Sequence, residues 1–158
     1  MKTVQTFILI LLIYEYAFAE THIYPSYQSK EKDPDTIAII IEATSGDLTG
    51  TSGDYFPDCG GTYTAELLDL NNDGQPEVFV QIGQSCMSGI IGNHIELYVK
   101  DKNGKWNEQF GFDGLPTFLD TFNEGFPDIE IGMTGDCFPV WRWNGEKYDL
   151  YKKCPDKF

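Results

Sequence analysis

The residues whose types and spacing best support a chemical role lie between Asp69 and Glu77. Oxygen-bearing side chains stand at positions one, three, five and nine of this stretch, and glycine stands at position six. The candidate ligands are the side chains of Asp69, Asn71, Asp73 and Glu77, together with the backbone carbonyl of Gln75. This spacing wraps alternate oxygens around one hard cation. Because three neighbouring carboxylates repel one another without a counter-ion, the sequence predicts a metal site.

Calcium fits this set of donors better than the other common metals. Ca²⁺ accepts many oxygens in flexible geometry, whereas Mg²⁺ demands a near-ideal octahedron. Zinc prefers Cys and His ligands, which the loop lacks. Gly74 supplies the sharp turn that a Cβ would obstruct. We therefore expect Ca²⁺ in a structural role, with an ordinary acidic turn that binds no metal as the alternative.

The flanks of the loop distinguish it from a helix–loop–helix calcium hand. That hand needs a glutamate at position twelve, where this chain has Val80. The flanking residues alternate as strands do. The pattern DxNxDGxxE resembles the β-flanked calcium loops of FG-GAP and VCBS-type repeats, over about a dozen residues. The resemblance implies a calcium loop between two strands, but not a propeller, for which the chain is too short.

The elements that must position this loop are short strands joined by tight turns. Residues 66–70 lead into the loop and residues 77–82 leave it with alternating apolar side chains. Residues 95–100 alternate as well. Asn103-Gly104 and Asn144-Gly145 each give the strongest short hairpin signal. These features predict antiparallel hairpins rather than crossover units.

A short internal repeat suggests duplication of a strand–turn–strand unit. Residues 73–78 align with residues 124–129, and each block shares the pattern Gly-x-Pro-acid. Cys86 and Cys137 each follow the glycine of their block by twelve residues. The distance from that glycine to the hairpin glycine is 30 residues in the first copy and 20 in the second, so we expect an insertion around residues 88–94.

The second copy does not repeat the ligand spacing. Phe122 and Asn123 do not reproduce the ligand spacing of the first block. We therefore expect one metal ion and not two.

One short helix is predicted before the strands. Asp33 is a good N-cap and Pro34 suits the first helical position. Ile37, Ile40, Ile41 and Thr44 follow at helical spacing, and Gly46 can end the helix, although the β-branched content also allows a strand. The fold class is therefore mainly β (α+β): a small antiparallel sheet domain built from two hairpin-containing pseudo-repeats plus one N-terminal helix.

The start of the chain has the layout of a secretory signal peptide. Lys2 precedes a short apolar core at residues 7–13, and Ala17-Phe18-Ala19 forms an A-x-A cleavage site. We expect residues 1–19 to be removed and residues 20–158 to form a single domain. The expected location is periplasmic or secreted, with no membrane span after cleavage.

Four cysteines, Cys59, Cys86, Cys137 and Cys154, fit this location. An even number in an exported chain favours two disulfides. The sequence alone leaves all three possible pairings open. No C-x-x-C pair is present, which disfavours metal binding by the thiols.

The net charge restricts the partners. With 25 acidic and 11 basic side chains, the formal charge is −14. Nucleic acid is a poor partner because its binding needs Lys and Arg clusters. Cations and basic proteins are good ones. The alternative is that the charge serves solubility alone.

Three aromatic residues are candidates for partner binding. Trp141 and Trp143 share one face if they lie in a strand, and they form either a recognition patch or part of the core. Tyr55 belongs to residues 52–56, which are similar to the SGxxY loop of bacterial periplasmic lysozyme inhibitors, with the tyrosine one position early. The alternative is a turn that contains glycine.

No catalytic motif accompanies these features. The chain has no G-x-S-x-G, P-loop or H-E-x-x-H pattern, and His22 and His94 lack a partner motif. We expect a protein that is not an enzyme and that acts by binding. The leading hypothesis is an inhibitor or immunity protein against a basic, peptidoglycan-degrading enzyme. The alternative is a carbohydrate-binding module at the cell surface.

Overall fold

A computed structural model describes residues 33–55, 60–83, 93–132 and 137–154. The predicted signal segment, residues 1–19, lies outside the described residues, as do Cys59 and Cys86. Within the described ranges, no helix is long and apolar enough to cross a membrane.

Helix α1 (Pro34–Ala43) begins at the predicted cap. The carboxylate of Asp33 accepts hydrogen bonds from the backbone N–H and the hydroxyl of Thr36, both at 2.9 Å. Pro34 occupies the first turn, where no backbone N–H is needed. Gly46, with φ +90°, follows the end of the helix. The helix interpretation is confirmed over the strand interpretation.

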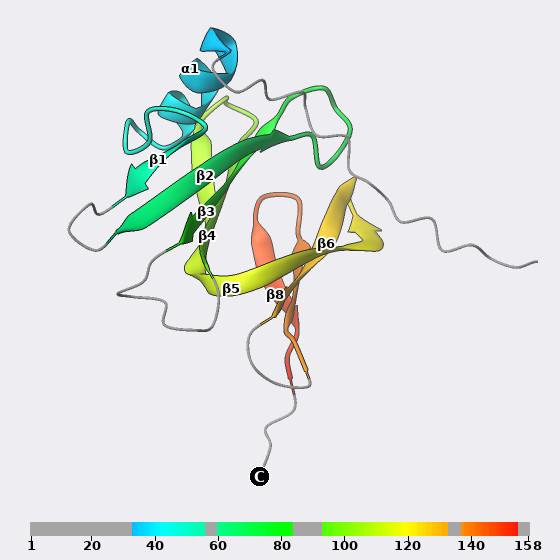
Figure 1. The fold of residues 1–158 in the computed structure, drawn as a ribbon. Coiled ribbons are helices and arrows are strands. Elements are labelled where there is room, and N and C mark those ends of the chain that lie inside the picture. Colours follow the sequence, from blue (N-terminus) through cyan, green and yellow to red (C-terminus); the bar gives the residue numbers. More distant parts are fainter. Residues whose placement is uncertain (1–32, 56–59, 84–92, 133–136, 155–158) are drawn as a thin grey trace, which may run out of the picture.

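Eight antiparallel strands follow the helix, and each pairs with its neighbours in chain order. This meander confirms the predicted mainly β fold class (Figure 1). The strands are β1 (Ser52–Tyr55), β2 (Gly61–Leu68), β3 (Glu77–Gly83), β4 (Asn93–Lys100), β5 (Trp106–Asn123), β6 (Phe126–Gly132), β7 (Val140–Trp143) and β8 (Tyr148–Lys152).

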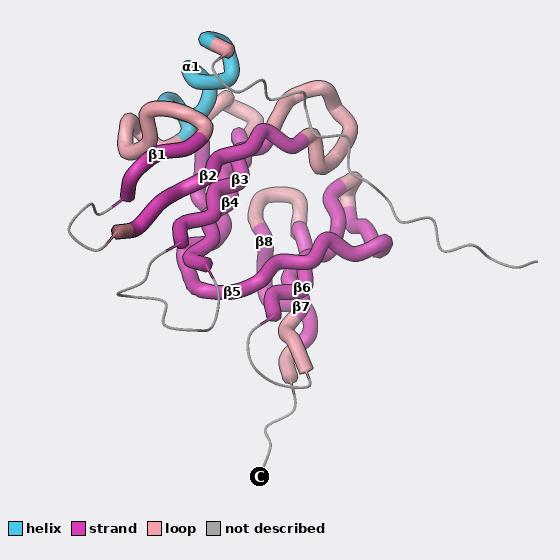
Figure 2. The backbone as a smooth tube through the Cα atoms, viewed as in Figure 1, coloured by secondary structure: helices cyan, strands magenta, loops and turns pink. Residues whose placement is uncertain are grey.

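Strand β5 joins two sheets. Its first part, as far as Gly114, pairs with β4, and its second part, from Leu115, pairs with β6. A Cβ added at Gly114 would lie 2.5 Å from Cγ2 of Ile131, so this position has room for glycine only. Figure 2 shows β5 running across from the β1–β4 strands to the β6–β8 strands.

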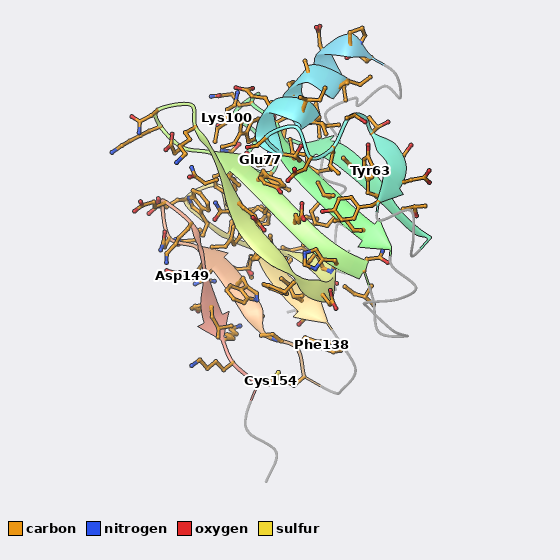
Figure 3. The ribbon with its side chains drawn as sticks, turned by 90° about the vertical axis from the view of Figure 1, so that its left-hand side faces the viewer. Tyr63, Glu77, Lys100, Phe138, Asp149 and Cys154 are labelled. Atoms are coloured by element: carbon orange, nitrogen blue, oxygen red, sulfur yellow. A yellow bond between two sulfur atoms is a disulfide. The ribbon has the colours of Figure 1, made fainter. Side chains whose placement is uncertain are left out.

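Two apolar clusters divide the domain into layers. One lies between α1 and the β1–β4 strands, and Ile40, Leu67 and Val80 are fully buried there. The other joins the two sheets and includes Leu70, Leu97 and Ile129. In Figure 3, α1 lies at the end of the sheet nearer Glu77, and Cys154 lies at the opposite end.

The described fold contains the duplication that the sequence predicts. The first unit consists of β2, β3, β4 and the first part of β5; the second consists of the rest of β5 with β6, β7 and β8. Val78 pairs with Tyr98 in the first unit, and the aligned Ile129 pairs with Trp141 in the second. Each unit closes with an Asn-Gly hairpin, whose glycine has positive φ.

Cys137 and Cys154 form a disulfide that ties the approach to β7 to the end of β8. The expectation of a loop or turn around Tyr55 is wrong, because Ser52–Tyr55 forms an edge strand that pairs with β2. Gly53 is required there, since an added Cβ would lie 2.9 Å from the Tyr63 ring.

Candidate metal centre

The predicted metal loop connects β2 to β3, as the sequence indicates. Leu68 pairs with Glu77 at its base, so the loop is closed by the sheet itself. Leu70 is fully buried in the cluster between the two sheets. Burial of such a side chain contributes about 1.5–3 kcal/mol, which fixes the first half of the loop against the protein.

Hydrogen bonds inside the loop turn its carboxylates inward. The Asp69 carboxylate accepts from the backbone N–H groups of Asp73 and Gly74, each at 3.1 Å. The Asn71 side-chain oxygen accepts from the Asp73 N–H at 3.1 Å, and its amide donates to the Asp73 carboxylate at 2.9 Å. Gly74 has φ +83°, which a side chain would strain. The sequence therefore encodes this turn locally.

Glu77 is the unusual member of the set, because it is only 4% exposed. Its carboxylate accepts one hydrogen bond, at 2.7 Å, from the backbone N–H of Leu70. Burial, followed by the charges of Asp73 and Asp69, raises its pKa to about 8. None of the ion pairs found among the described residues reaches Glu77. A buried carboxylate without a cation is costly.

The aligned carboxylate of the second unit, Asp128, does have a cation. Asp128 is 2% exposed and accepts two hydrogen bonds from the Arg142 guanidinium, at 2.8 and 2.6 Å. The Thr121 hydroxyl donates to the same carboxylate. Arg142 holds the pKa of Asp128 below its usual range, against the opposing effect of burial. The register of the two units places Val99 where the second unit has Arg142.

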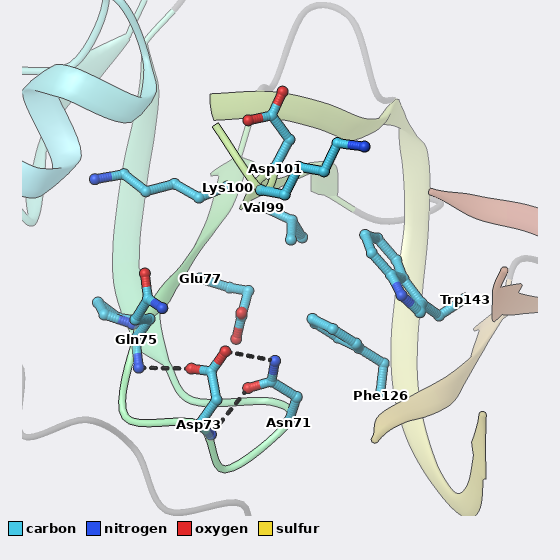
Figure 4. A pocket seen from close by; sticks show the side chains of 11 residues that line it. Asn71, Asp73, Gln75, Glu77, Val99, Lys100, Asp101, Phe126 and Trp143 are labelled. Atoms are coloured by element: carbon cyan, nitrogen blue, oxygen red, sulfur yellow. Dashed lines mark hydrogen bonds between the residues drawn. The ribbon is translucent and has the colours of Figure 1, made fainter. Parts of the chain in front are cut away.

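The donor chemistry of the first unit fits a calcium ion. Figure 4 shows the carboxylates of Asp73 and Glu77 pointing toward one another, with the Asn71 side chain beside them. Each carboxylate oxygen that accepts an N–H retains a second lone pair for a metal. The described residues contain no group of three or more His, Cys, Asp or Glu side chains gathered tightly enough to hold an ion as they stand. Binding therefore requires the loop to contract by drawing its carboxylates together.

A cleft adjoins the loop. Its narrow part, of about 190 Å³, is lined by Asn71, Asp73, Gln75 and Glu77 on one side and by Phe126 and Trp143 on the other. A wider part of about 410 Å³ continues between the β4–β5 and β7–β8 hairpins. Four of the five predicted ligand residues thus border this cleft, where Asp73 and Gln75 are exposed and Glu77 is buried.

The candidate partner residues lie in different places. Trp143 is 8% exposed and stacks on Phe126, with ring centroids 4.4 Å apart. Trp141 is half-buried against the same cluster and lies 5.7 Å from the Phe110 ring. Both observations favour the core interpretation over an exposed patch. Tyr55 makes an edge contact with Tyr63 on the other side of the sheet.

The pair formed by Asp128 and Arg142 was not predicted from the sequence. The alignment of the two blocks matches Glu77 with Asp128, which shows only that an acid recurs at this position. Arg142 gave no signal of its own, because its contact depends on the pairing of β6 with β7.

Neither a protein-family model, nor a curated protein, nor a solved structure matches this chain. The resemblance to FG-GAP and VCBS-type loops therefore stays a prediction.

Proposed function

We propose that this chain is an exported calcium-binding protein whose ion is held by residues 69–77. The observation that carries the proposal is the burial of Glu77 beside Asp69 and Asp73 with no cation from the described part of the chain. A divalent ion would remove the repulsion among the three carboxylates. Backbone carbonyls and amide oxygens complete the kind of shell that Ca²⁺ accepts.

The second unit supports this assignment because it shows what the buried position requires. Asp128 has a guanidinium within hydrogen-bonding distance, and Val99 at the equivalent position of the first unit is apolar. In the aligned loop positions the second unit also has acids, at Asp120 and Glu124, but it has Phe122 where the first unit has Asn71. The first unit therefore differs by one further oxygen donor and by the apolar Val99 in place of the arginine.

The binding of calcium can be measured directly. Isothermal titration of the chelator-treated protein with CaCl₂ should give one site, and MgCl₂ should compete poorly. Asp73→Ala should abolish the heat. Asp120→Asn, which removes an exposed carboxylate of β5 outside the loop, should leave it unchanged. A titration that is silent for the unaltered protein would end the calcium assignment.

For the biological role we propose protein binding, as an inhibitor or immunity protein against a basic cell-wall hydrolase. The net charge of −14 favours attraction to such an enzyme. Two acidic side chains, Glu96 on β4 and Glu108 on β5, lie close enough for their charges to interact. Burial and the Glu96 charge raise the pKa of Glu108, with His94 as the opposing positive influence.

This role predicts capture of the enzyme that weakens with salt. Titration of the protein against lysozyme and a panel of other basic secreted hydrolases should give inhibition at low ionic strength, reduced at 0.5 M NaCl on the order expected from screening. Glu96→Gln with Glu108→Gln should weaken inhibition, while Asp120→Asn should not. Inhibition that is insensitive to salt and to both substitutions would contradict an electrostatic interface.

The carbohydrate-binding alternative has one observation in its favour. Trp143 lines the cleft beside the metal loop, although most of its ring is buried. This geometry differs from an exposed pair formed by Trp141 and Trp143.

A further inference from the structure

Strand β8 is the last strand of the meander, and within the described part of the chain it pairs with β7 alone. Its first residue, Tyr148, is buried, and the four residues that follow are exposed. Figure 3 shows this strand between the labelled Asp149 and Cys154. In the described fold β8 is therefore an edge strand, beside which a further strand can add.

Hydrogen bonds show which backbone groups of β8 face outward. The Asn144 N–H donates to the Lys147 carbonyl at 2.9 Å, so the next pair of the antiparallel ladder, which contains Tyr148, is a non-hydrogen-bonded one. In agreement, the Tyr148 N–H donates to the side-chain oxygen of Gln109 at 3.0 Å. Because backbone groups alternate along a strand, those of Leu150 also face away from β7. Gln109 closes the edge at Tyr148, and the edge is open from Leu150 onward.

An exposed aromatic side chain lies beside this open edge. Tyr151 is 48% exposed, and the guanidinium carbon of Arg142 lies 3.6 Å from the centroid of its ring. Arg142 is itself fixed by its two hydrogen bonds to Asp128. A pocket of about 200 Å³ adjoins the ring, with Asn123 and Leu150 also in its lining. Tyrosine and arginine are among the residues that most often dominate the binding energy of protein interfaces.

The basic side chains of the protein are unevenly distributed. Residues 33–83 contain no lysine or arginine. The basic side chains of the described residues all lie in residues 100–105 or 142–153. Strand β1, the edge strand at the other end of the meander, belongs to the acidic segment. Of the two end strands, β8 alone combines an edge with positive charge.

Two lysines at the end of β8 are available to a partner. Arg142 and Lys147 each already pair with a carboxylate of the protein. Lys152 and Lys153 are exposed, and neither takes part in the ion pairs found among the described residues. An anionic group beside β8 would therefore meet two uncompensated positive charges.

The open edge and its charge together select the occupant. The edge is satisfied by another peptide backbone, which supplies N–H and C=O groups in alternation. A second copy of β8 would bring its own lysines against Lys152 and Lys153, and like charges on neighbouring strands repel. Carboxylates on the added strand would instead attract these lysines. Charge complementarity therefore favours an acidic, extended segment of a different protein.

We propose that the open edge of β8 binds an acidic, extended segment of a partner protein as an added strand. The backbone of that segment pairs with Leu150, and its carboxylates lie beside Lys152 and Lys153. One of its apolar side chains enters the pocket beside Tyr151. This interaction depends neither on the calcium site nor on the hydrolase.

The first experiment compares peptides of opposite charge. The mature chain is titrated into labelled nonapeptides of alternating glutamate and valine, or of alternating lysine and valine. Fluorescence anisotropy is followed in about 0.15 M NaCl, which screens distant charges. The acidic peptide should bind about tenfold more tightly, because it alone matches the lysines of β8. The net charge of −14 by itself favours the lysine peptide, so equal binding or the opposite preference would overturn the proposal.

The second experiment tests pairing of the backbones. The acidic peptide is N-methylated at its valines in one version and at its glutamates in the other. An added strand turns the N–H groups of alternate residues toward its neighbour. One version should therefore bind as the parent peptide does, and the other should lose affinity about tenfold. Equal binding of the two versions, or loss of binding in both, would contradict strand addition.

Variants of the protein locate the site. Lys152→Gln with Lys153→Gln should weaken binding of the acidic peptide about fivefold, and Tyr151→Ala about tenfold. Lys102→Gln with Lys105→Gln removes two exposed lysines of the β4–β5 hairpin and is the matched control. Equal losses in the two lysine variants would place the peptide elsewhere.

Two further measurements exclude other occupants of the edge. Polyphosphate, an anion without a peptide backbone, should not displace the acidic peptide at equal charge concentration. Displacement would indicate a general anion site and overturn the proposal. The protein alone should be a monomer in sedimentation equilibrium. A dimer that is lost in Tyr151→Ala would assign the edge to a second copy of the chain instead.

Discussion

Glu77 and Asp128 occupy equivalent places in the two units, yet their surroundings differ. Both are almost completely buried. Asp128 accepts two hydrogen bonds from Arg142 and has a lowered pKa, whereas Glu77 accepts one from a backbone N–H and has a raised pKa. The same fold position therefore holds a carboxylate paired with a guanidinium in one unit and a carboxyl group without a cationic partner, whose pKa is raised, in the other.

The contrast is what the proposed calcium site would explain. A guanidinium attached to the chain compensates the Asp128 carboxylate permanently. Under the proposal, the buried acid beside the apolar Val99 is compensated by a cation from outside. The stability of the protein should then rise with the concentration of that cation.

The largest expected effect comes from breaking the ion pair of Asp128 with Arg142. Arg142→Met should destabilise the protein by about 3–5 kcal/mol, because Asp128 is left buried without its cation. Urea denaturation followed by fluorescence measures the change. Lys147→Met removes an exposed ion pair with Asp149 and should cost less than about 1 kcal/mol. Equal losses of stability in the two variants would show that the buried ion pair contributes no more than the exposed one.

The second prediction concerns Glu77 and its proposed calcium ion. At a calcium concentration about 100-fold above the dissociation constant, unfolding should cost about 2.7 kcal/mol more than in EDTA. Asp73→Ala should remove this difference, because a loop ligand is lost. Arg142→Met should retain it, because the second unit does not bind the ion. An identical melting temperature with and without chelator would show that the first unit needs no cation.

The third prediction exchanges the charge of Glu77 for an amide. In EDTA at neutral pH, Glu77→Gln should stabilise the protein by about 1–2 kcal/mol, since the folded state no longer carries a carboxyl group whose pKa is about 8. The glutamine oxygen can still accept the Leu70 N–H. In calcium the sign should reverse, because a ligand is missing. Destabilisation under both conditions would mean that the Glu77 carboxylate is already well satisfied.

Local signals in the sequence predict much of this architecture. The cap at Asp33, the loop at residues 69–77 and the two Asn-Gly hairpins depend on a few adjacent residues, and each has the expected position in the structure. The duplication was also visible, because the Gly-x-Pro-acid pattern is short and contiguous. Such features are set by backbone preferences and not by distant contacts.

Features that depend on strand pairing were not predicted. Strand β5 is 18 residues long, but Gly111, Gly114 and Pro116 interrupt its apolar alternation. The pair of Asp128 with Arg142 joins residues that only the pairing of β6 with β7 brings together. The edge strand at Ser52–Tyr55 likewise depends on β2, since its own sequence reads as a turn. The cleft requires both hairpins and could not be derived from either.

Per pH unit, the smallest expected change in stability comes from a pair of opposite pH dependences. The pKa of Asp128 is lowered on folding, so its contribution to stability is present at neutral pH and is lost as the pH falls through the folded value. The pKa of Glu77 is raised to about 8, so in EDTA stability is highest below about 4.5 and declines as the pH rises toward 8.

Each of these groups changes the free energy of unfolding by at most about 1.4 kcal/mol per pH unit. Denaturation curves in EDTA at several pH values, for the unaltered protein, Glu77→Gln and Asp128→Asn, separate the two contributions. Glu77→Gln should remove the decline in stability between pH 5 and 8, which corresponds to the release of roughly one proton. Asp128→Asn should remove part of the loss of stability at acid pH. Because calcium replaces the proton at Glu77, adding it should abolish the decline in the unaltered protein. If the decline in stability persists in Glu77→Gln, another group causes it. The electrostatic contrast between the two units would then no longer hold.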